Sequence, residues 1–285
     1  MSKRSIRTMR DMKVAIVQPE IQALHPGRNY EAMARAVVAA AKEGCDLVVL
    51  PELSNTGFVR SYDAAFAREL WDAAEPVDGP LVQSLGRLAV DSKISVVVGL
   101  ALRHPEITGV LRNVSFLFGR DDQQHHHVKV HLPREEKRYF EEGANLGVVE
   151  TAACKLGMLV CADIAFPEAA RSLALQGAEL IAVPMCAPKP KNPQLYQGIA
   201  VARAYENQAY VLIANRVGVD HNIGFGGGSI IAAPDGSIVA RLGSEPDMAI
   251  ATLDHGLLLD ERLRQTRFRD RRPHLYGAIA KGSVQ

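Results

Sequence analysis

Short apolar runs alternate with amphipathic stretches along most of this chain, from Val14 to about Asp254. Two such runs, KVAIVQP (13–19) and CDLVVLPE (45–52), carry consecutive apolar residues and reach a proline, which is typical of strands buried on both faces. The stretch between them, 29–44, has an apolar stripe at helical spacing and ends at a glycine. This alternation predicts a layered α/β domain.

The same pattern continues through the rest of the chain. A helix is predicted to begin after Asp78, and a second helix is predicted from Pro167 to Gly177. A third helix closes at 202–208, and a hairpin is predicted at 226–242. Further strands are predicted at 94–103, 112–118, 125–132, 155–163, 178–184 and 209–218. Strands joined both by helices and by hairpins indicate mixed β-sheets.

The two ends of the chain differ from this pattern. Residues 1–12 are basic and are not followed by the long apolar core of a secretion signal, so a flexible tail is predicted there. A short organelle presequence is the alternative. No linker divides 13–255, which is predicted to be one domain. The Arg-rich segment 256–285 is predicted to be a tail that lies over a surface of its own or of a partner.

Charge and cysteine content exclude several classes of partner. Lys and Arg total 33 against 32 Asp and Glu, so the formal net charge is +1. Such a chain has no overall field to attract nucleic acid or an acidic membrane surface. No run approaches the ~18 apolar residues that a membrane span needs. The four cysteines form no CxxC pair, which predicts free thiols and a cytoplasmic location.

Two motifs suggest a metal site or a cofactor site, but each lacks residues that such a site requires. In His125-His126-His127 alternate side chains of a strand point to opposite faces, and no further ligand lies at metal-binding spacing. The segment GFGGGS (224–229) precedes a hairpin and lacks the Lys-Ser/Thr ending of a phosphate-binding loop. We therefore predict neither a metal nor a cofactor.

Three positions carry candidate chemistry. Cys161 lies between an apolar strand and a helix, where unpaired backbone N–H groups can lower the pKa of a thiol. Glu52 directly follows a buried strand and a proline, so its carboxyl group could act as a general base. Lys129 shares one face of its strand with His127 and His131. Taken singly, each has a structural alternative: a buried small thiol, a capping acid and a solvated lysine.

Together these positions resemble the nitrilase, or carbon–nitrogen hydrolase, superfamily. The resemblance runs from Val14 to Tyr276 and rests on six segments in the family's order. They are LPELSNTGF around Glu52, KVHLPREEKRYFEEG from Lys129, GMLVCADIAFPEAAR around Cys161, ARAYENQAYVLIANRVG, FGGGSIIAAPDGSIVA and RDRRPHLY.

The resemblance implies a Glu–Lys–Cys triad of Glu52, Lys129 and Cys161, with Glu136 as a second glutamate that positions the lysine and the substrate. Glu135 is the alternative for that last role. The implied fold is a four-layer α-β-β-α sandwich with mixed β-sheets. The implied assembly is a homodimer or a higher homo-oligomer, with C-terminal tails that cross between subunits.

The implied reaction is cleavage of a small amide to a carboxylic acid and ammonia through a cysteine thioester. Cys-Ala-Asp at the nucleophile is similar to the amidase and carbamoylase branches, whereas nitrile-cleaving relatives often have Cys-Trp-Glu. Carbamoylases carry arginines where this chain has Ile164 and Ala165, so a neutral amide is preferred to an N-carbamoyl amino acid. Nitrile hydrolysis and a non-catalytic binding protein of the same fold are further alternatives.

Four residues are candidates for contact with the substrate: Ala162, Ile164, Tyr62 and Met185. Ala162 stands where many relatives have an aromatic residue, which would leave a roomier site. For Tyr62, packing in the core is the alternative.

Overall fold

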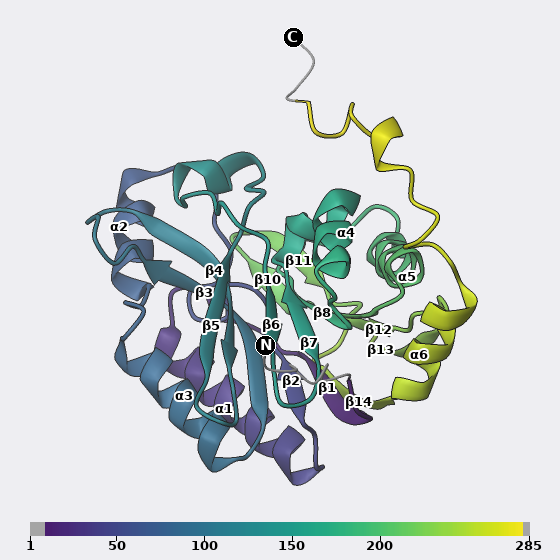
Figure 1. Ribbon diagram of the computed structural model, residues 1–285. Helices are drawn as coiled ribbons and strands as arrows, with labels where there is room; N and C mark the ends of the chain where they lie inside the picture. The colour runs from purple at the N-terminus through teal and green to yellow at the C-terminus, as the bar shows by residue number, and fades with distance from the viewer. Residues whose placement is uncertain (1–8, 282–285) are drawn as a thin grey trace.

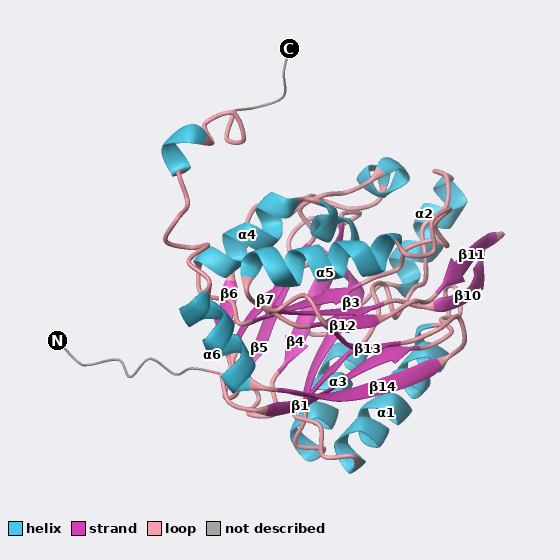
Figure 2. Ribbon diagram, turned by 90° about the vertical axis from the view of Figure 1, so that its right-hand side faces the viewer, coloured by secondary structure: helices cyan, strands magenta, loops and turns pink. Residues whose placement is uncertain are grey.

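Two six-stranded β-sheets lie face to face in the computed structural model, which describes residues 9–281, and helices cover both outer faces (Figures 1 and 2). The apolar core between the sheets includes Val14, Met158 and Leu212. Each of these side chains is at most 2% exposed. The α-β-β-α sandwich with mixed sheets that the sequence predicts is therefore confirmed.

The first sheet contains the N-terminal strands in the order β14-β1-β2-β3-β4-β5. Strands β1, β2 and β3 are parallel, whereas β14, β4 and β5 are antiparallel to their neighbours. The strands are β1 (Met12–Gln18), β2 (Leu47–Val49), β3 (Ser95–Arg103), β4 (Leu111–Phe118), β5 (Gln124–Val128) and β14 (Asp247–Leu253). Helices α1 (Pro26–Lys42) and α3 (Pro80–Asp91) cover its outer face and bury apolar stripes that include Val37 and Leu85.

The second sheet has the order β13-β12-β9-β8-β7-β6, with parallel pairing of β7, β8 and β9. Its outer face is covered by α4 (Pro167–Leu175) and α5 (Leu195–Asn207), which both lie on that side in Figure 1. The strands are β6 (Val148–Glu150), β7 (Lys155–Met158), β8 (Leu180–Pro184), β9 (Tyr210–Ala214), β12 (Ile230–Ala232) and β13 (Ile238–Arg241).

Some elements differ from the sequence-based expectations. The strand predicted at 209–218 is divided into β9 and β10 (Val217–Asp220), and β10 pairs with β11 (Ile223–Gly226) in a separate hairpin. Asn215 explains the break, because its side chain bonds the backbone of neighbouring segments, including the Gly227 carbonyl at 2.9 Å. Helix α2 (Ala64–Ala73), which Asp63 caps, was not expected.

The two termini also differ from simple tails. Strand β1 begins at Met12, and the Met9 N–H donates to the Glu179 carboxylate at 3.0 Å. Residues 1–8 of the predicted N-terminal tail lie outside the described residues. The predicted C-terminal tail begins as α6 (His255–Arg264), which packs on the body of the molecule. Beyond α6 the chain runs away from the sheets (Figures 1 and 2). Within residues 9–281 no helix is long and apolar enough to cross a membrane.

Candidate active site

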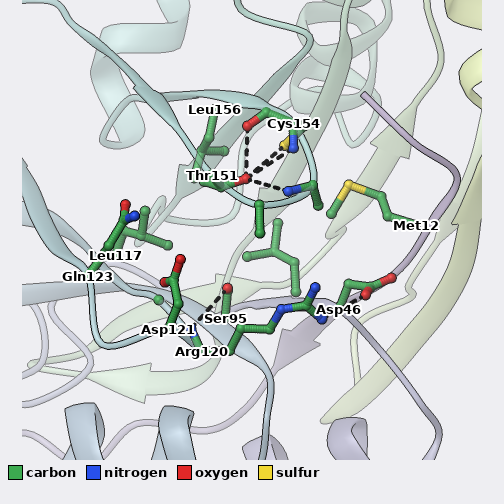
Figure 3. A pocket seen from close by; sticks show the side chains of 14 residues that line it. Met12, Asp46, Ser95, Leu117, Arg120, Asp121, Gln123, Thr151, Cys154 and Leu156 are labelled. Atoms are coloured by element: carbon green, nitrogen blue, oxygen red, sulfur yellow. Dashed lines mark hydrogen bonds and ion pairs between the residues drawn. The ribbon is translucent and has the colours of Figure 1, made fainter. Parts of the chain in front are cut away.

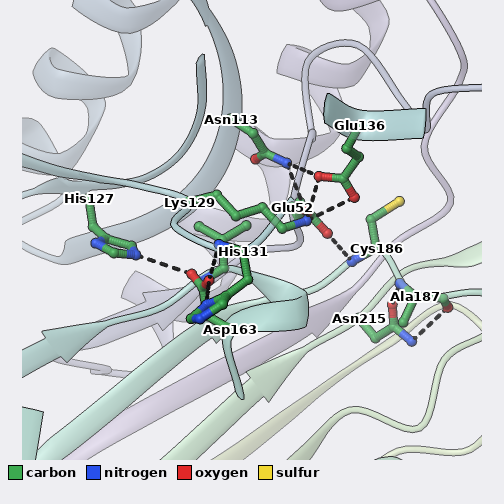
Figure 4. A network of polar contacts seen from close by, with 11 residues as sticks. Glu52, Asn113, His127, Lys129, His131, Glu136, Asp163, Cys186, Ala187 and Asn215 are labelled. Atoms are coloured by element: carbon green, nitrogen blue, oxygen red, sulfur yellow. Dashed lines mark hydrogen bonds and ion pairs between the residues drawn. The ribbon is translucent and has the colours of Figure 1, made fainter. Parts of the chain in front are cut away.

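Lys129 lies just past β5 and is completely buried. Its ammonium group contacts two carboxylates: Nζ is 2.7 Å from Glu52 Oε1 and 2.6 Å from Glu136 Oε2 (Figure 4). Burial lowers the pKa of Lys129, but the charges of Glu52, Cys161 and Glu136 outweigh this effect and raise it above its ordinary value. The lysine is therefore a permanent cation inside the protein, and its counter-charges make such burial tolerable.

Glu52 connects the two sheets. It follows β2 of the first sheet, and its Oε2 accepts a hydrogen bond at 2.8 Å from the N–H of Cys186, just after β8 of the second sheet. Its Oε1 accepts from Lys129 at 2.7 Å and from Asn113 Nδ2 at 2.8 Å. A Cβ atom on Gly99 would lie 2.2 Å from the Glu52 Cα, so only glycine lets β3 pass this close.

Glu136 comes from a short 3-10 helix, Arg134–Arg138, and is also buried. Burial raises the pKa of Glu136 to about 7, against the opposing charge of Lys129. Its neighbour Glu135 points elsewhere, because its carboxylate accepts the Tyr62 N–H at 3.1 Å. Of the two glutamates that the sequence left open, Glu136 is thus the one that contacts the lysine.

Cys161 begins the 3-10 helix Cys161–Ala165 directly after the strand β7 and its two-residue extension. It is half-buried and has φ of +42°, a left-handed conformation that is uncommon for a non-glycine residue. Such conformations occur disproportionately at functional sites, where the surrounding structure holds them.

The pKa of the Cys161 thiol is raised well above its ordinary value. Burial contributes most, the Glu52 carboxylate adds to it, and the Lys129 ammonium opposes both. The sequence-based expectation of a lowered pKa at the strand–helix junction is therefore wrong, because two carboxylates and burial outweigh one lysine. The raised pKa makes this cysteine a neutral thiol at rest.

The four residues predicted to bind substrate do not share one cavity. Ala162 lines a cavity of about 180 Å³ together with His131 and Phe166. Tyr62 is 48% exposed, and its ring lies 5.6 Å from that of Tyr139. Ile164 and Met185 are buried among the apolar side chains beneath α4 and α5.

Two residues near the site were missed from the sequence. Asn113, in β4, donates to Glu52, and the signal was an amide inside a predicted strand that is mostly apolar. Burial and the charge of Cys161 raise the pKa of Tyr196 in α5 to about 12, and both side chains pack against the same apolar cluster beneath α4 and α5. Tyr196 also lines a cavity of about 400 Å³, whose other walls include Lys189 and Arg241.

A further cavity, shown in Figure 3, contains none of the candidate catalytic residues. Its lining includes Met12, Asp46 and Cys154, and its volume is about 20 Å³. This is roughly the space of one water molecule, which excludes it as a substrate pocket. Among the described residues, no group of three or more His, Cys, Asp or Glu side chains could hold a metal ion.

Comparison with known proteins identifies the family of this chain. The family model described as carbon–nitrogen hydrolase matches residues 13–259. The chain is 34% identical over 271 residues to a nitrilase of Pyrococcus abyssi, covering 93% of this chain and 99% of the relative. It is 30% identical over 267 residues to an (R)-stereoselective amidase of a Pseudomonas species, covering 93% of each protein.

A solved structure is also similar. It is a mutant of the amidase from Nesterenkonia sp. AN1 that shows Michael addition of acrylamide at the active site cysteine. The TM-score is 0.80 at 26% sequence identity, with 94% of this chain and 99% of the other covered.

Proposed function

Because the chain belongs to the carbon–nitrogen hydrolase family of the nitrilase superfamily, we propose that it hydrolyses a small amide through a thioester on Cys161. The observation that carries this proposal is the buried Lys129 ammonium, held 2.7 Å from Glu52 and 2.6 Å from Glu136. The charges of Glu52 and Lys129 both act on the Cys161 thiol. A base, a cation and a nucleophile that act on one another are the groups that acyl transfer requires.

In the first half-reaction Glu52 accepts the thiol proton while Cys161 Sγ attacks the carbonyl carbon of the amide. Lys129 and the backbone N–H of Ala162 stabilise the oxyanion, and each fixed donor contributes on the order of 3–4 kcal/mol. Glu52 then gives its proton to the departing nitrogen, ammonia leaves, and the acyl group remains on sulfur as a thioester.

In the second half-reaction Glu52 accepts a proton from a water molecule as the water oxygen attacks the thioester carbon. The C–S bond breaks, the carboxylic acid leaves, and the proton returns to the sulfur. The raised pKa of Cys161 supports this scheme, since a neutral thiol must lose its proton to Glu52 as the new bond forms. Glu136 holds Lys129 throughout, at 2.6 Å.

For the substrate we propose a neutral primary amide, since Ile164 and Ala165 stand where carbamoylases carry arginines. The similarity to an (R)-stereoselective amidase supports the amide branch. One observation favours a second candidate, an N-carbamoyl amino acid: Lys189 and Arg241 both line the 400 Å³ cavity beside Tyr196 and could attract a carboxylate.

A substrate panel separates these candidates. We expect short aliphatic and aromatic amides to have kcat/KM values at least about 10-fold above those of N-carbamoyl amino acids and nitriles, because a tenfold ratio needs only about 1.4 kcal/mol of differential binding. Ammonia release measures all three classes alike. Preferential turnover of the carbamoyl compounds would instead support the second candidate, and preferential turnover of nitriles would contradict both.

We further propose that the protein is cytoplasmic and forms a homodimer or larger homo-oligomer. Four free cysteines support a reducing compartment. The C-terminal segment runs away from the sheets and exposes Leu275, Tyr276 and Ile279, and a second subunit would cover them. Light scattering of the full chain tests this assembly, and a monomeric mass would contradict it.

A further inference from the structure

A buried carboxylate that the mechanism does not use lies two residues after the nucleophile. Asp163 is completely buried, and four donors surround its two oxygens (Figure 4). Oδ2 accepts from the Val160 N–H at 3.0 Å and from His127 Nε2 at 3.2 Å. Oδ1 accepts from the His131 N–H at 2.9 Å and from His131 Nδ1 at 2.8 Å.

The carboxylate fixes the protons on both rings. Burial raises the pKa of Asp163, but the hydrogen bond and charge of His127, together with the Val160 N–H and His131, outweigh it and leave the pKa below its ordinary value. An ionised carboxylate can only accept hydrogen bonds. His127 therefore carries a proton on Nε2, and His131 carries one on Nδ1.

The two histidines lie two residues on either side of Lys129. Strand β5 ends at Val128, so the contacts of the three side chains, and not strand alternation, show where each of them lies. Lys129 contacts the two glutamates, and the histidines contact Asp163. Asp163 thus joins two segments: the turn that contains Cys161, which follows β7 of the second sheet, and the segment that contains Lys129, which follows β5 of the first sheet.

The same carboxylate closes the turn that carries the nucleophile. The Asp163 N–H donates to the Val160 carbonyl at 3.0 Å, while the Val160 N–H donates back to Asp163 Oδ2. Cys161 lies inside this reciprocal pair and adopts its left-handed conformation there. A residue in this sparsely populated region persists only where neighbouring contacts hold it.

We propose that Asp163, held by His127 and His131, is a positioning residue that sets the placement of the Cys161 sulfur relative to the Lys129 ammonium. The inference rests on the proposed function, because it assigns a role within that same site. Asp163 is not a catalytic residue here. It acts only through the backbone of the Cys161 turn and through the segment that contains Lys129.

The test compares His127→Phe and Asp163→Asn with His125→Gln. His125 belongs to the same strand but is exposed, so its variant is the matched control. We expect the two network variants to lose up to about 100-fold in kcat, with KM within about 2-fold, because misplacing reacting groups by about 1 Å can cost that much. The control should match the wild type. His127→Gln keeps an N–H donor and should recover part of the loss.

A second readout does not depend on any substrate. The rate at which iodoacetamide alkylates Cys161 follows its thiolate fraction, and the charges of Glu52, Lys129 and Glu136 act on that thiol. If Lys129 moves away, the stabilised thiolate is lost, and the pH midpoint of alkylation should shift upward in both network variants. The double variant should be no worse than either single variant, since both changes break one network.

The outcomes separate the two proposals. Folded variants with unchanged kcat and an unchanged alkylation midpoint would reduce the network to a structural role and overturn the inference. Should His127→Phe or Asp163→Asn fail to fold by circular dichroism, His127→Gln carries the same test. If the wild-type protein turned over no amide, the proposed function would fail, while a shifted alkylation midpoint would still support the positioning role.

Discussion

Replacement of Cys161 by alanine is expected to lower amide turnover by at least about 10⁴-fold, because a nucleophile acts together with its base and cannot be replaced by the remaining groups. The fold should survive the change. Cys161 is only half-buried, and removal of one sulfur atom from the edge of the core leaves Glu52, Lys129 and Glu136 hydrogen-bonded as before. Steady-state ammonia release and thermal unfolding measure the two effects.

Cys45→Ala is the matched control for this experiment. Cys45 is a buried free thiol between α1 and β2, and its side chain packs among the residues under α1. Its removal should leave kcat within about 2-fold of the wild-type value, since surface and packing changes away from a site act mainly on stability. Turnover by pure Cys161→Ala protein at more than a few per cent of wild type would rule out the thioester route.

Glu52→Gln is expected to be the second most damaging change, with a loss of about 10³-fold or more in kcat. In the proposed mechanism the carboxylate acts in both half-reactions, so both would lose their proton acceptor. The hydrogen bonds that the Glu52 carboxylate accepts add a second reason for the loss. Oε1 accepts from Lys129 and Asn113, and Oε2 accepts from the Cys186 N–H. Glutamine has a single acceptor oxygen, so in either orientation its NH₂ group faces at least one of these donors.

This placement of one hydrogen-bond donor against another should also lower the free energy of unfolding. A buried donor left without an acceptor costs about 1–3 kcal/mol, so the unfolding free energy of Glu52→Gln should fall by about that amount. Glu135→Gln is the matched control, because Glu135 contacts the Tyr62 N–H and not the lysine. It should retain wild-type activity. A Glu52→Gln protein with near-normal kcat would mean that another group accepts the thiol proton.

The sequence predicted the layers because they depend on local pattern, whereas the site residues were inferred from the resemblance to a family. Alternation predicted that His127, Lys129 and His131 share one side. In the structure the two histidines contact Asp163 of the second sheet, whereas Lys129 contacts Glu52, which follows β2 of the first sheet. The partners of these side chains could not be predicted, because Asp163 and Asn113 meet them only after distant strands pack together. Local pattern contains no information about such distances.

Two of the sequence-based predictions were wrong because they depend on contacts between distant segments. The pKa of Cys161 depends on the balance among burial, two carboxylates and one ammonium, and only the packed structure sets that balance. The strand expected at 209–218 is interrupted because the Asn215 side chain bonds segments on either side of it, which include the Ala187 N–H at 3.1 Å. The apolar run at 209–218 does not show that Asn215, near its end, bonds segments that are distant in the sequence.

The central claim is that the acyl group of the substrate passes through the sulfur of Cys161. Mass mapping of the protein, acid-quenched during turnover of a slowly hydrolysed amide, tests it most directly. We expect a single acyl group on the peptide that contains Cys161, and none on the same peptide of Cys161→Ala. An acyl group on another residue, or full turnover by protein whose Cys161 is quantitatively alkylated, would contradict the claim.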